Sequence, residues 1–271
     1  MNGRWPGELG ALEAQILGDG RIDGEDVLRL RRAIYQNGEI SRDEALFLFH
    51  LNRRTAEKVA AWEEFFVEAL SDFFYWRNGS DSTLTPDAEQ MLLDAIGAEV
   101  DDATELHLLL NLMFRINGAS ERFRGFVLDA VRHSVLHSEQ ALFGHARRRP
   151  GVIDSADVEV IRRLVYGMGS QSGFAISRIE AEFLFELNDA TAGRVNDPGW
   201  RDLFVKAVTM YLLFSGDTPD RIDEPEAHWL LTRINGNGRS CDNERELLAY
   251  LKKETGGVHP LLQPLCQRMG V

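Results

Sequence analysis

The residues best suited to chemistry lie near the end of the chain, where four acids follow one another at three-residue intervals. The segment SGDTPDRIDEPE contains these acids, Asp217, Asp220, Asp223 and Glu226. Divalent cations such as Ca²⁺ prefer carboxylate oxygens, so one interpretation is a non-standard divalent-metal site. The alternative is a capping box, in which Asp223 and Glu226 exchange hydrogen bonds at a helix start. An earlier matching segment, NGSDSTLTPDA, keeps only Asp81 and Asp87, which favours the capping interpretation.

A second candidate set lies on one predicted helix. Asp129, His133 and His137 are spaced by four residues, so they share one helix face and could ligate a metal. The other half of the chain has no matching trio, which favours an ordinary surface helix. Neither Cys241 nor Cys266 lies in the local pattern of a nucleophile. We therefore expect a protein that is not an enzyme and that has no cofactor, with a divalent cation as the alternative.

The elements that would position these residues are organised around a duplicated stretch. Residues 40–52 read ISRDEALFLFHLN, and residues 176–188 read ISRIEAEFLFELN. Ten of the thirteen positions are identical at an offset of 136 residues. Ser41 and Glu44, like Ser177 and Glu180, have the spacing of a capping box. The apolar residues that follow have a helical period, and Asn52 and Asn188 are predicted to end the two helices.

The duplication extends in both directions from this stretch. Asp23 is matched by Asp154, Trp62 by Trp200, and the apolar positions around them also recur. A basic run followed by proline and glycine, at residues 143–151, is the predicted seam. No segment alternates long enough to indicate a sheet. The sequence therefore predicts an all-α fold of two tandem pseudo-symmetric units, 1–145 and 150–271, with both tryptophans in the core.

Some polar positions recur without a capping role, namely Arg31/Arg162, Arg32/Arg163 and Tyr35/Tyr166. We expect an arginine on the first helix of a helix pair to contact Glu44 or Glu180 across the turn, holding the two helices at their angle. The basic run Arg147 to Arg149 is expected to be a solvated linker.

The turns before these helices resemble parts of EF-hand calcium loops. GDGRIDGEDV at 18–27 and QNGEISRDE at 36–44 match the second half of such a loop. The early ligand positions are occupied by Gln15, Leu17 and Asp19 in the first loop, and by Ala33, Tyr35 and Asn37 in the second. Apolar side chains cannot supply the six to eight oxygens that Ca²⁺ needs. The resemblance therefore implies degenerate EF-hand-like helix-turn-helix pairs without a standard calcium site.

The same turns within an all-helical unit are similar to the TerB-like helical domains linked to tellurite resistance. The similarity is clearest at residues 37–44 and 79–90. It implies divalent-metal binding by acids near the turns and a role as an interaction module in larger assemblies.

Composition limits the partners. The formal net charge of −13 disfavours nucleic acid and anionic membranes. Two cysteines fit a reducing compartment, and neither a signal peptide nor a membrane span is predicted. The sequence therefore predicts a cytoplasmic, non-catalytic interaction or regulatory module that binds an unidentified protein.

Overall fold

A computed structural model describes residues 5, 7–77, 83–167, 176–214, 221–236 and 241–271. Over these residues the chain is helical, as predicted, and its strands are only two residues long. It divides into two compact units, residues 1–120 and 121–271, which are described separately. The predicted seam at residues 143–151 lies within the second of them. No helix in the described ranges is long and apolar enough to cross a membrane.

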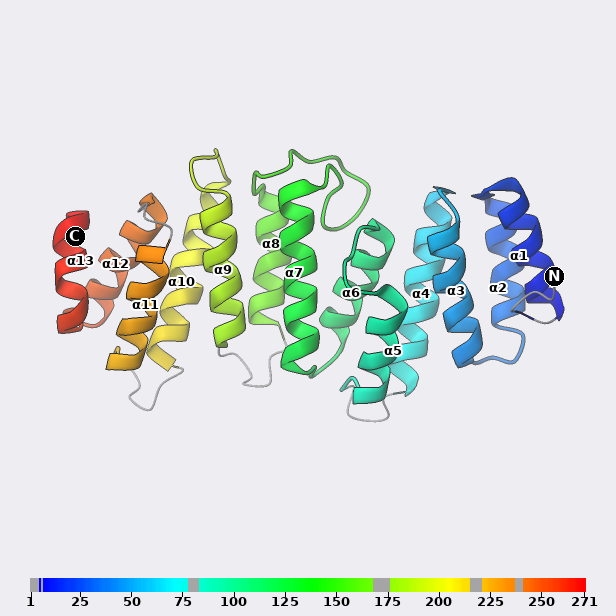
Figure 1. The fold of residues 1–271 in the computed structure, drawn as a ribbon, viewed down its shortest axis with the longest axis horizontal. Helices are drawn as coiled ribbons and strands as arrows, with labels where there is room; N and C mark the ends of the chain where they lie inside the picture. The colour runs from blue at the N-terminus through cyan, green and yellow to red at the C-terminus, as the bar shows by residue number, and fades with distance from the viewer. Residues whose placement is uncertain (1–4, 6, 78–82, 168–175, 215–220, 237–240) are drawn as a thin grey trace. The chain divides into compact units, whose positions relative to one another are not determined.

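The first unit is labelled α1 to α6 in Figure 1. Its elements, in order, are α1 (Gly7–Asp19), β1 (Arg21–Ile22), α2 (Gly24–Ile34), α3 (Arg42–Arg54), β2 (Glu57–Lys58), α4 (Ala60–Arg77), α5 (Pro86–Ile96) and α6 (Ala103–Arg115). Helix α4 is central and packs against α2, α3 and α6. Its Trp62, Phe65 and Phe66 are fully buried, as the nearly continuous apolar sequence of this helix predicts.

The second unit has a similar order of helices. Its elements are α7 (Glu121–His137), α8 (Ser155–Tyr166), α9 (Arg178–Ala190), α10 (Pro198–Phe214), α11 (Glu224–Gly236), α12 (Asp242–Glu254), a 3₁₀ turn η2 (Pro260–Leu262) and α13 (Gln263–Met269). Helix α10 is central and packs against α8, α9 and α12. Trp200 at its start is 1% exposed, so the prediction that both tryptophans lie in the core is confirmed.

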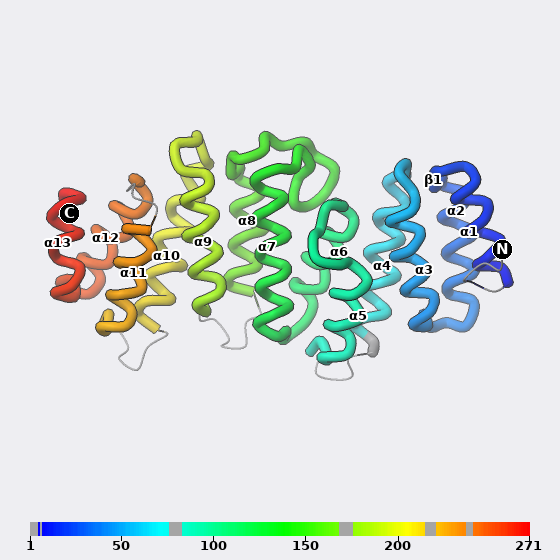
Figure 2. The backbone as a smooth tube through the Cα atoms, viewed as in Figure 1, coloured from blue at the N-terminus to red at the C-terminus, as the bar shows by residue number. Residues whose placement is uncertain are grey.

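A short backbone contact fixes the turn that leads into each central helix. In the first unit β1 pairs with β2 in parallel, and the Val59 N–H donates to Ile22 O at 3.2 Å. Figure 2 labels β1 just above α2. In the second unit the Asp197 N–H donates to Ile153 O at 2.8 Å. These contacts hold the residues just before α4 and α10 next to the residues just before α2 and α8.

The predicted helix ends at Asn52 and Asn188 are wrong. Helix α3 continues to Arg54 and α9 to Ala190, so both asparagines lie within the last helical turn. They are 1% and 2% exposed respectively. A buried amide must find hydrogen-bond partners, and these partners, rather than a left-handed backbone, account for asparagine at both positions.

Candidate functional site

The described half of the acidic loop forms a helix cap. The Asp223 N–H donates to Glu226 Oε2 and the Glu226 N–H donates to Asp223 Oδ1, each at 2.9 Å. This reciprocal pair is the capping box of α11. Asp217 and Asp220 lie outside the described residues. The two described acids therefore have the geometry of the structural alternative.

The side chains of the second candidate set contact residues of their own helix, α7. Asp129 forms an ion pair with Arg132 at 2.7 Å, and the rings of His133 and His137 are 4.5 Å apart. His137 Nδ1 also lies 3.0 Å from the His133 carbonyl. Among the residues that the structure describes, no group of three His, Cys, Asp or Glu side chains is placed to hold a metal ion.

The acids of the EF-hand-like turns act as caps. Asp23 Oδ1 accepts from the Asp26 N–H at 3.0 Å, and Asp26 Oδ2 accepts from the Asp23 N–H at 3.1 Å. At α3, the Ser41 N–H donates to Glu44 Oε2 at 2.7 Å. At α9, the Ser177 N–H donates to Glu180 Oε2 at 2.7 Å. The predicted positions of these caps are confirmed.

The predicted partner across the turn is wrong for Arg31 and for Arg162. Arg31 forms a two-pronged ion pair with Glu68 on α4, at 2.6 and 3.1 Å, rather than with Glu44. Arg162 pairs with Glu159 on its own helix at 3.5 Å. Glu44 and Glu180 already accept hydrogen bonds as part of helix caps. Arg31 and Arg162 pair with other acids, so neither arginine bridges a turn.

Glu180 is instead neutralised by an arginine from α7. Arg124 Nη1 lies 2.8 Å from Glu180 Oε1, and the two side chains are 4% and 3% exposed. A buried ion pair compensates for desolvation only when both partners are present. This contact joins α7 to α9 within the second unit.

The expectation of a solvated basic linker is also wrong for Arg148. Its Nη2 lies 3.0 Å from Asp157 Oδ2, and both side chains are at most 2% exposed. It also donates to the carbonyls of Ser134 and Val152. Desolvation raises the pKa of Asp157 to about 6 although Arg148 opposes the shift. Arg147, by contrast, is exposed and pairs with Glu139.

A polar cluster surrounds Asn52 in the first unit. Asn52 Oδ1 accepts from Trp62 Nε1 at 2.9 Å and from Lys58 Nζ at 3.1 Å. The same Nζ contacts Asn52 O at 3.0 Å and Asp102 Oδ2 at 2.6 Å. Lys58 therefore places an ammonium between the end of α3 and the N-cap of α6.

An arginine completes this cluster. Arg53 Nε lies 3.1 Å from Glu105 Oε1, and the Glu105 side chain is 3% exposed. Burial raises the pKa of Glu105, and the bond from Arg53 lowers it in part. Burial is the largest single effect on Asp102 and acts in the same direction, but the charge and hydrogen bond of Lys58, with hydrogen bonds from Asn52 and Thr104, together outweigh it and lower the pKa of Asp102. Each of the two acids therefore has its own cation.

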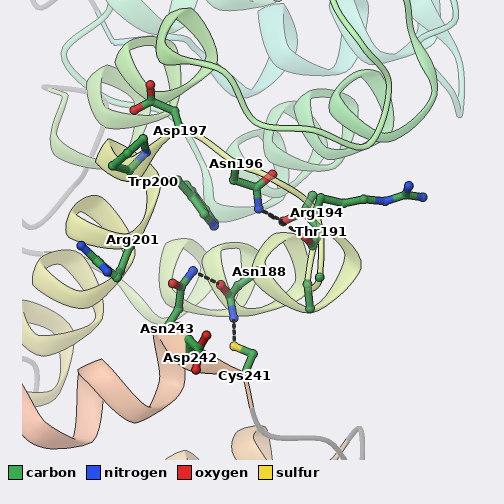
Figure 3. Close-up of a pocket in the computed structure, with 13 residues that line it drawn as sticks. Asn188, Thr191, Arg194, Asn196, Asp197, Trp200, Arg201, Cys241, Asp242 and Asn243 are labelled. Carbon is green, nitrogen blue, oxygen red and sulfur yellow. Dashed lines mark hydrogen bonds between the residues drawn. The ribbon is translucent and has the colours of Figure 1, made fainter.

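The second unit has a cavity beside Asn188, with a volume of about 450 Å³. It is lined by the end of α9, the turn before α10 and the start of α12. Figure 3 shows Asn188 between Asn243 and Cys241. Asn188 Oδ1 accepts from Asn243 Nδ2 at 2.8 Å, and Asn188 Nδ2 donates to Cys241 Sγ at 3.2 Å. A cavity of this size is within the range of small-molecule sites.

One buried polar atom of the cavity wall and one beside the wall lack a hydrogen-bond partner within the described part of the chain. The first is Trp200 Nε1, on a ring that lines the cavity and that Figure 3 shows directed toward Asn188. The second is Oε1 of Glu244, a residue that is 0% exposed. Its Oε2 accepts at 2.8 Å from the N–H of Cys241, which lines the cavity. Unpartnered buried polar atoms are costly, so we take this cavity as the candidate site among the residues that the structure describes.

The other side chains around the cavity fix its walls. Asn196 Oδ1 accepts from the Ile153 N–H at 3.0 Å, and its Nδ2 donates to Thr191 O at 3.2 Å. Arg194 and Arg201 lie at the rim, and Figure 3 shows both directed away from Asn188. Burial raises the pKa of the Cys241 thiol, so the thiol stays protonated near neutral pH.

Sequence reasoning missed this cavity, although two signals for it were present. The helical period placed Asn52 on the same face as Ala45 and Phe49, and a polar residue on an apolar face is typical of a buried hydrogen-bonded site. The absence of a lysine matching Lys58 was a second signal. The interpretation of asparagine as a helix end concealed both.

Comparisons with models of protein families, with curated proteins and with solved structures find no match to this chain. The resemblances to EF-hand loops and to TerB-like domains stay predictions. The site must therefore be interpreted from its own contacts.

Proposed function

We propose that this protein is a non-catalytic binding module, built from two copies of one helical unit, and that its second copy binds a small polar ligand beside Asn188. The observation that carries the proposal is the cavity of about 450 Å³ in contact with the unpartnered Nε1 of Trp200. A ligand with a hydrogen-bond acceptor would satisfy that buried donor.

The inference of two copies is supported by local contacts that recur at matching places. In each unit a buried asparagine lies in the last turn of one helix, Asn52 in α3 and Asn188 in α9. A buried tryptophan lies near the start of the next helix, Trp62 in α4 and Trp200 in α10. The residue that caps the sixth helix is Asp102 in one unit and Cys241 in the other. These similarities add to the ten identical residues at 40–52 and 176–188.

On this proposal the two copies have diverged at the position four residues before the tryptophan. The first copy fills it with Lys58, and the second has Asn196 four residues before its tryptophan. Asn196 turns instead toward Ile153 and Thr191. Replacement of a long side chain by a short one that points elsewhere accounts for the space beside Asn188.

The non-catalytic part of the proposal is supported by the chemistry of the cavity wall. Its thiol, Cys241, has a raised pKa because it is buried, and a protonated thiol is a poor nucleophile. Its amides, Asn188 and Asn243, bind each other. The two carboxylates of the wall, Asp197 and Asp242, accept from the Gly199 N–H and pair with Arg245 respectively. The amides and the protonated thiol recognise a ligand by hydrogen bonding and supply neither a base nor an activated nucleophile.

The wider role that we propose is that of a cytoplasmic interaction or regulatory module with a protein partner. The charge of −13 supports a partner with a basic surface over nucleic acid or an anionic membrane.

Ligand-observed NMR with a panel of small polar compounds tests the proposal on the full chain. We expect at least one compound to bind the wild type and not an Asn196→Lys/Cys241→Asp variant, which rebuilds the first unit's ion pair inside the cavity. Asn196→Ala is the matched control, because it removes the same hydrogen bonds to Ile153 and Thr191 but leaves the cavity open. Binding that is equal in the wild type and the filled variant, or no binding at all, would refute the proposed site.

A further inference from the structure

The first unit contains a complete binding site for an ammonium group. Lys58 Nζ contacts three oxygens, Asn52 O at 3.0 Å, Asn52 Oδ1 at 3.1 Å and Asp102 Oδ2 at 2.6 Å. An ammonium has three donors, so this set of acceptors satisfies it fully. The site lies at the C-terminal end of α3, where the helix dipole favours positive charge.

The second unit keeps the helix end but not the lysine. Asn188 lies in the last turn of α9, as Asn52 does in α3. The carbonyl groups of a last helical turn lack partners within the helix, so they favour a donor or a cation. Asn196 replaces Lys58, and the cavity lies against Asn188 and Asn196.

The matching positions of the two units differ in charge, and the second unit is the more negative of the two at these positions. In the first unit Arg53 and Lys58 oppose Glu105 and Asp102. The matching positions of the second unit are occupied by Asp189, Asn196, Glu244 and Cys241. Two cations and two acids have become two acids and two neutral residues. None of these four positions of the second unit holds a cation.

Glu244 makes this imbalance costly. Its side chain is fully buried, and its Oε1 has no hydrogen-bond partner in the described chain. Asp189, which stands where the first unit has Arg53, repels it and adds to the effect of burial in raising its pKa. The rim arginines Arg194 and Arg201 are directed away from Asn188 in Figure 3. Asp242 is paired with Arg245 at 3.1 Å. A bound cation would offset the charge of the buried acid, whereas a bound anion would add to it.

Trp200 adds a second requirement. Its counterpart Trp62 donates to Asn52 Oδ1 at 2.9 Å, whereas Asn188 Oδ1 accepts from Asn243 and not from Trp200. The Nε1 of Trp200 therefore has no acceptor among the described residues. A hydroxyl or carbonyl on the same ligand would supply it.

We infer that the cavity of the second unit binds a small primary alkylammonium compound that also carries a hydroxyl or carbonyl group. Its ammonium takes the place that Lys58 Nζ has in the first unit, and its oxygen accepts from Trp200 Nε1. The inference rests on the proposed function, because it names the class of ligand for the same cavity.

Four matched probes test the class of ligand on the full chain by NMR titration at neutral pH. They are aminobutanol, butanediol and hydroxybutyrate, each with both functional groups terminal, and butylamine. We expect aminobutanol to bind about tenfold or more tightly than the neutral diol, because a hydrogen bond from a charged donor is stronger than one from a neutral donor. We expect the anionic acid not to bind, because its carboxylate would add to the charge of the buried acid. The Asn196→Lys/Cys241→Asp variant should lose this binding, and Asn196→Ala should retain it.

A comparison of two amines tests the role of Trp200. Trp200→Phe should weaken aminobutanol by about tenfold, because its hydroxyl loses the Nε1 donor, and should leave butylamine within about twofold. The ratio of the two affinities is independent of any general loosening of the fold. An unchanged ratio would overturn the assignment of the hydroxyl to Trp200.

The outcomes also separate this inference from the proposed function. If butanediol or hydroxybutyrate binds as well as aminobutanol, or if only non-amines from the wider panel bind, the ammonium inference fails and the binding function survives. If neither the four probes nor any panel compound binds, both fail.

Discussion

The Asn52 cluster of the first unit and the Asn188 cavity of the second begin from the same kind of residue and end differently. Asn52 has an ammonium, an indole N–H and a neutralised acid around it. Asn188 has a second amide, a thiol and open space. In the first arrangement the ammonium and the indole N–H both find acceptors within the chain, although Asn52 Nδ2 has no partner among the described residues. In the second, the Trp200 N–H finds no acceptor among them and lies beside a cavity, which is typical of a binding site.

A similar contrast holds where the two units bury an acid at a helix start. Asp26 on α2 is contacted by a neutral side chain, Gln15, at 3.2 Å. Asp157 on α8 is contacted by Arg148 at 3.0 Å, with both side chains buried. The second unit thus depends on buried charge where the first uses a neutral hydrogen bond. Variants that remove either partner should show how much this difference matters.

The largest effect is expected from Arg148→Met. This change leaves the Asp157 carboxylate buried without its cation, and we expect a loss of about 3–5 kcal/mol in the free energy of unfolding at neutral pH. Gln15→Met, which removes the neutral partner of Asp26, should cost about 1 kcal/mol. Urea unfolding followed by circular dichroism measures both. Equal losses would show that the two caps are neutralised in equivalent ways.

The pH dependence of stability should reveal the same difference. Burial raises the pKa of Asp157 from 3.8 to about 6, so the fold favours the protonated acid. This contribution is present below about pH 4 and is lost as the pH rises through about 6. Relative to Asp157→Asn, the wild type should lose about 2–3 kcal/mol between pH 4 and pH 7. A stability difference between the two proteins that does not vary with pH would contradict this interpretation.

Lys58→Met tests the first unit's own ammonium. We expect a cost of about 1–3 kcal/mol, because Asp102 and the carbonyl of Asn52 lose their partner. Lys206 on α10 is an exposed lysine, and Lys206→Met should change stability by less than about 0.5 kcal/mol. Chemical denaturation of both variants measures the two changes in the free energy of unfolding. If Lys58→Met is as mild as its control, the cluster is not a stabilising one.

The two tryptophans sharpen the comparison further. Trp62→Phe removes a hydrogen bond to Asn52 as well as ring volume, but Trp200→Phe removes a donor that has no partner among the described residues. Trp62→Phe should therefore cost about 1–2 kcal/mol more than Trp200→Phe. The difference in unfolding free energy between the two variants is the measurement. A greater cost at Trp200 would mean that its Nε1 is satisfied in solution.

The smallest effect is expected from divalent cations. The described acids of the turns are occupied as helix caps, so millimolar Ca²⁺ or Mg²⁺ should leave the melting temperature nearly unchanged. A tight site would instead raise stability by about 2.7 kcal/mol at a hundredfold excess of cation. A rise of that size which disappears in Asp220→Asn/Asp223→Asn would restore the metal-binding alternative.

The sequence by itself determined the local features of this protein. Capping boxes at Ser41 and Ser177 join residues three positions apart, so their spacing was enough to predict them. The nearly continuous apolar sequence of residues 61–76 likewise predicted a central helix, and the repetition of Trp62 at Trp200 predicted two buried rings. These features depend on neighbours along the chain, which the sequence displays directly.

The tertiary structure decided which side chains meet across the fold. Arg124 and Glu180 are 56 residues apart, and Asn188 and Cys241 are 53 apart, so no local pattern pairs them. Arg148, in a basic run that resembles a solvated linker, is buried because a carboxylate lies opposite it. The cavity depends on packing in the same way, since it exists only where the turn before α10 meets the start of α12. Local spacing fixes hydrogen bonds within a helical turn, but burial and the neutralisation of charge depend on residues that only the folded chain brings together.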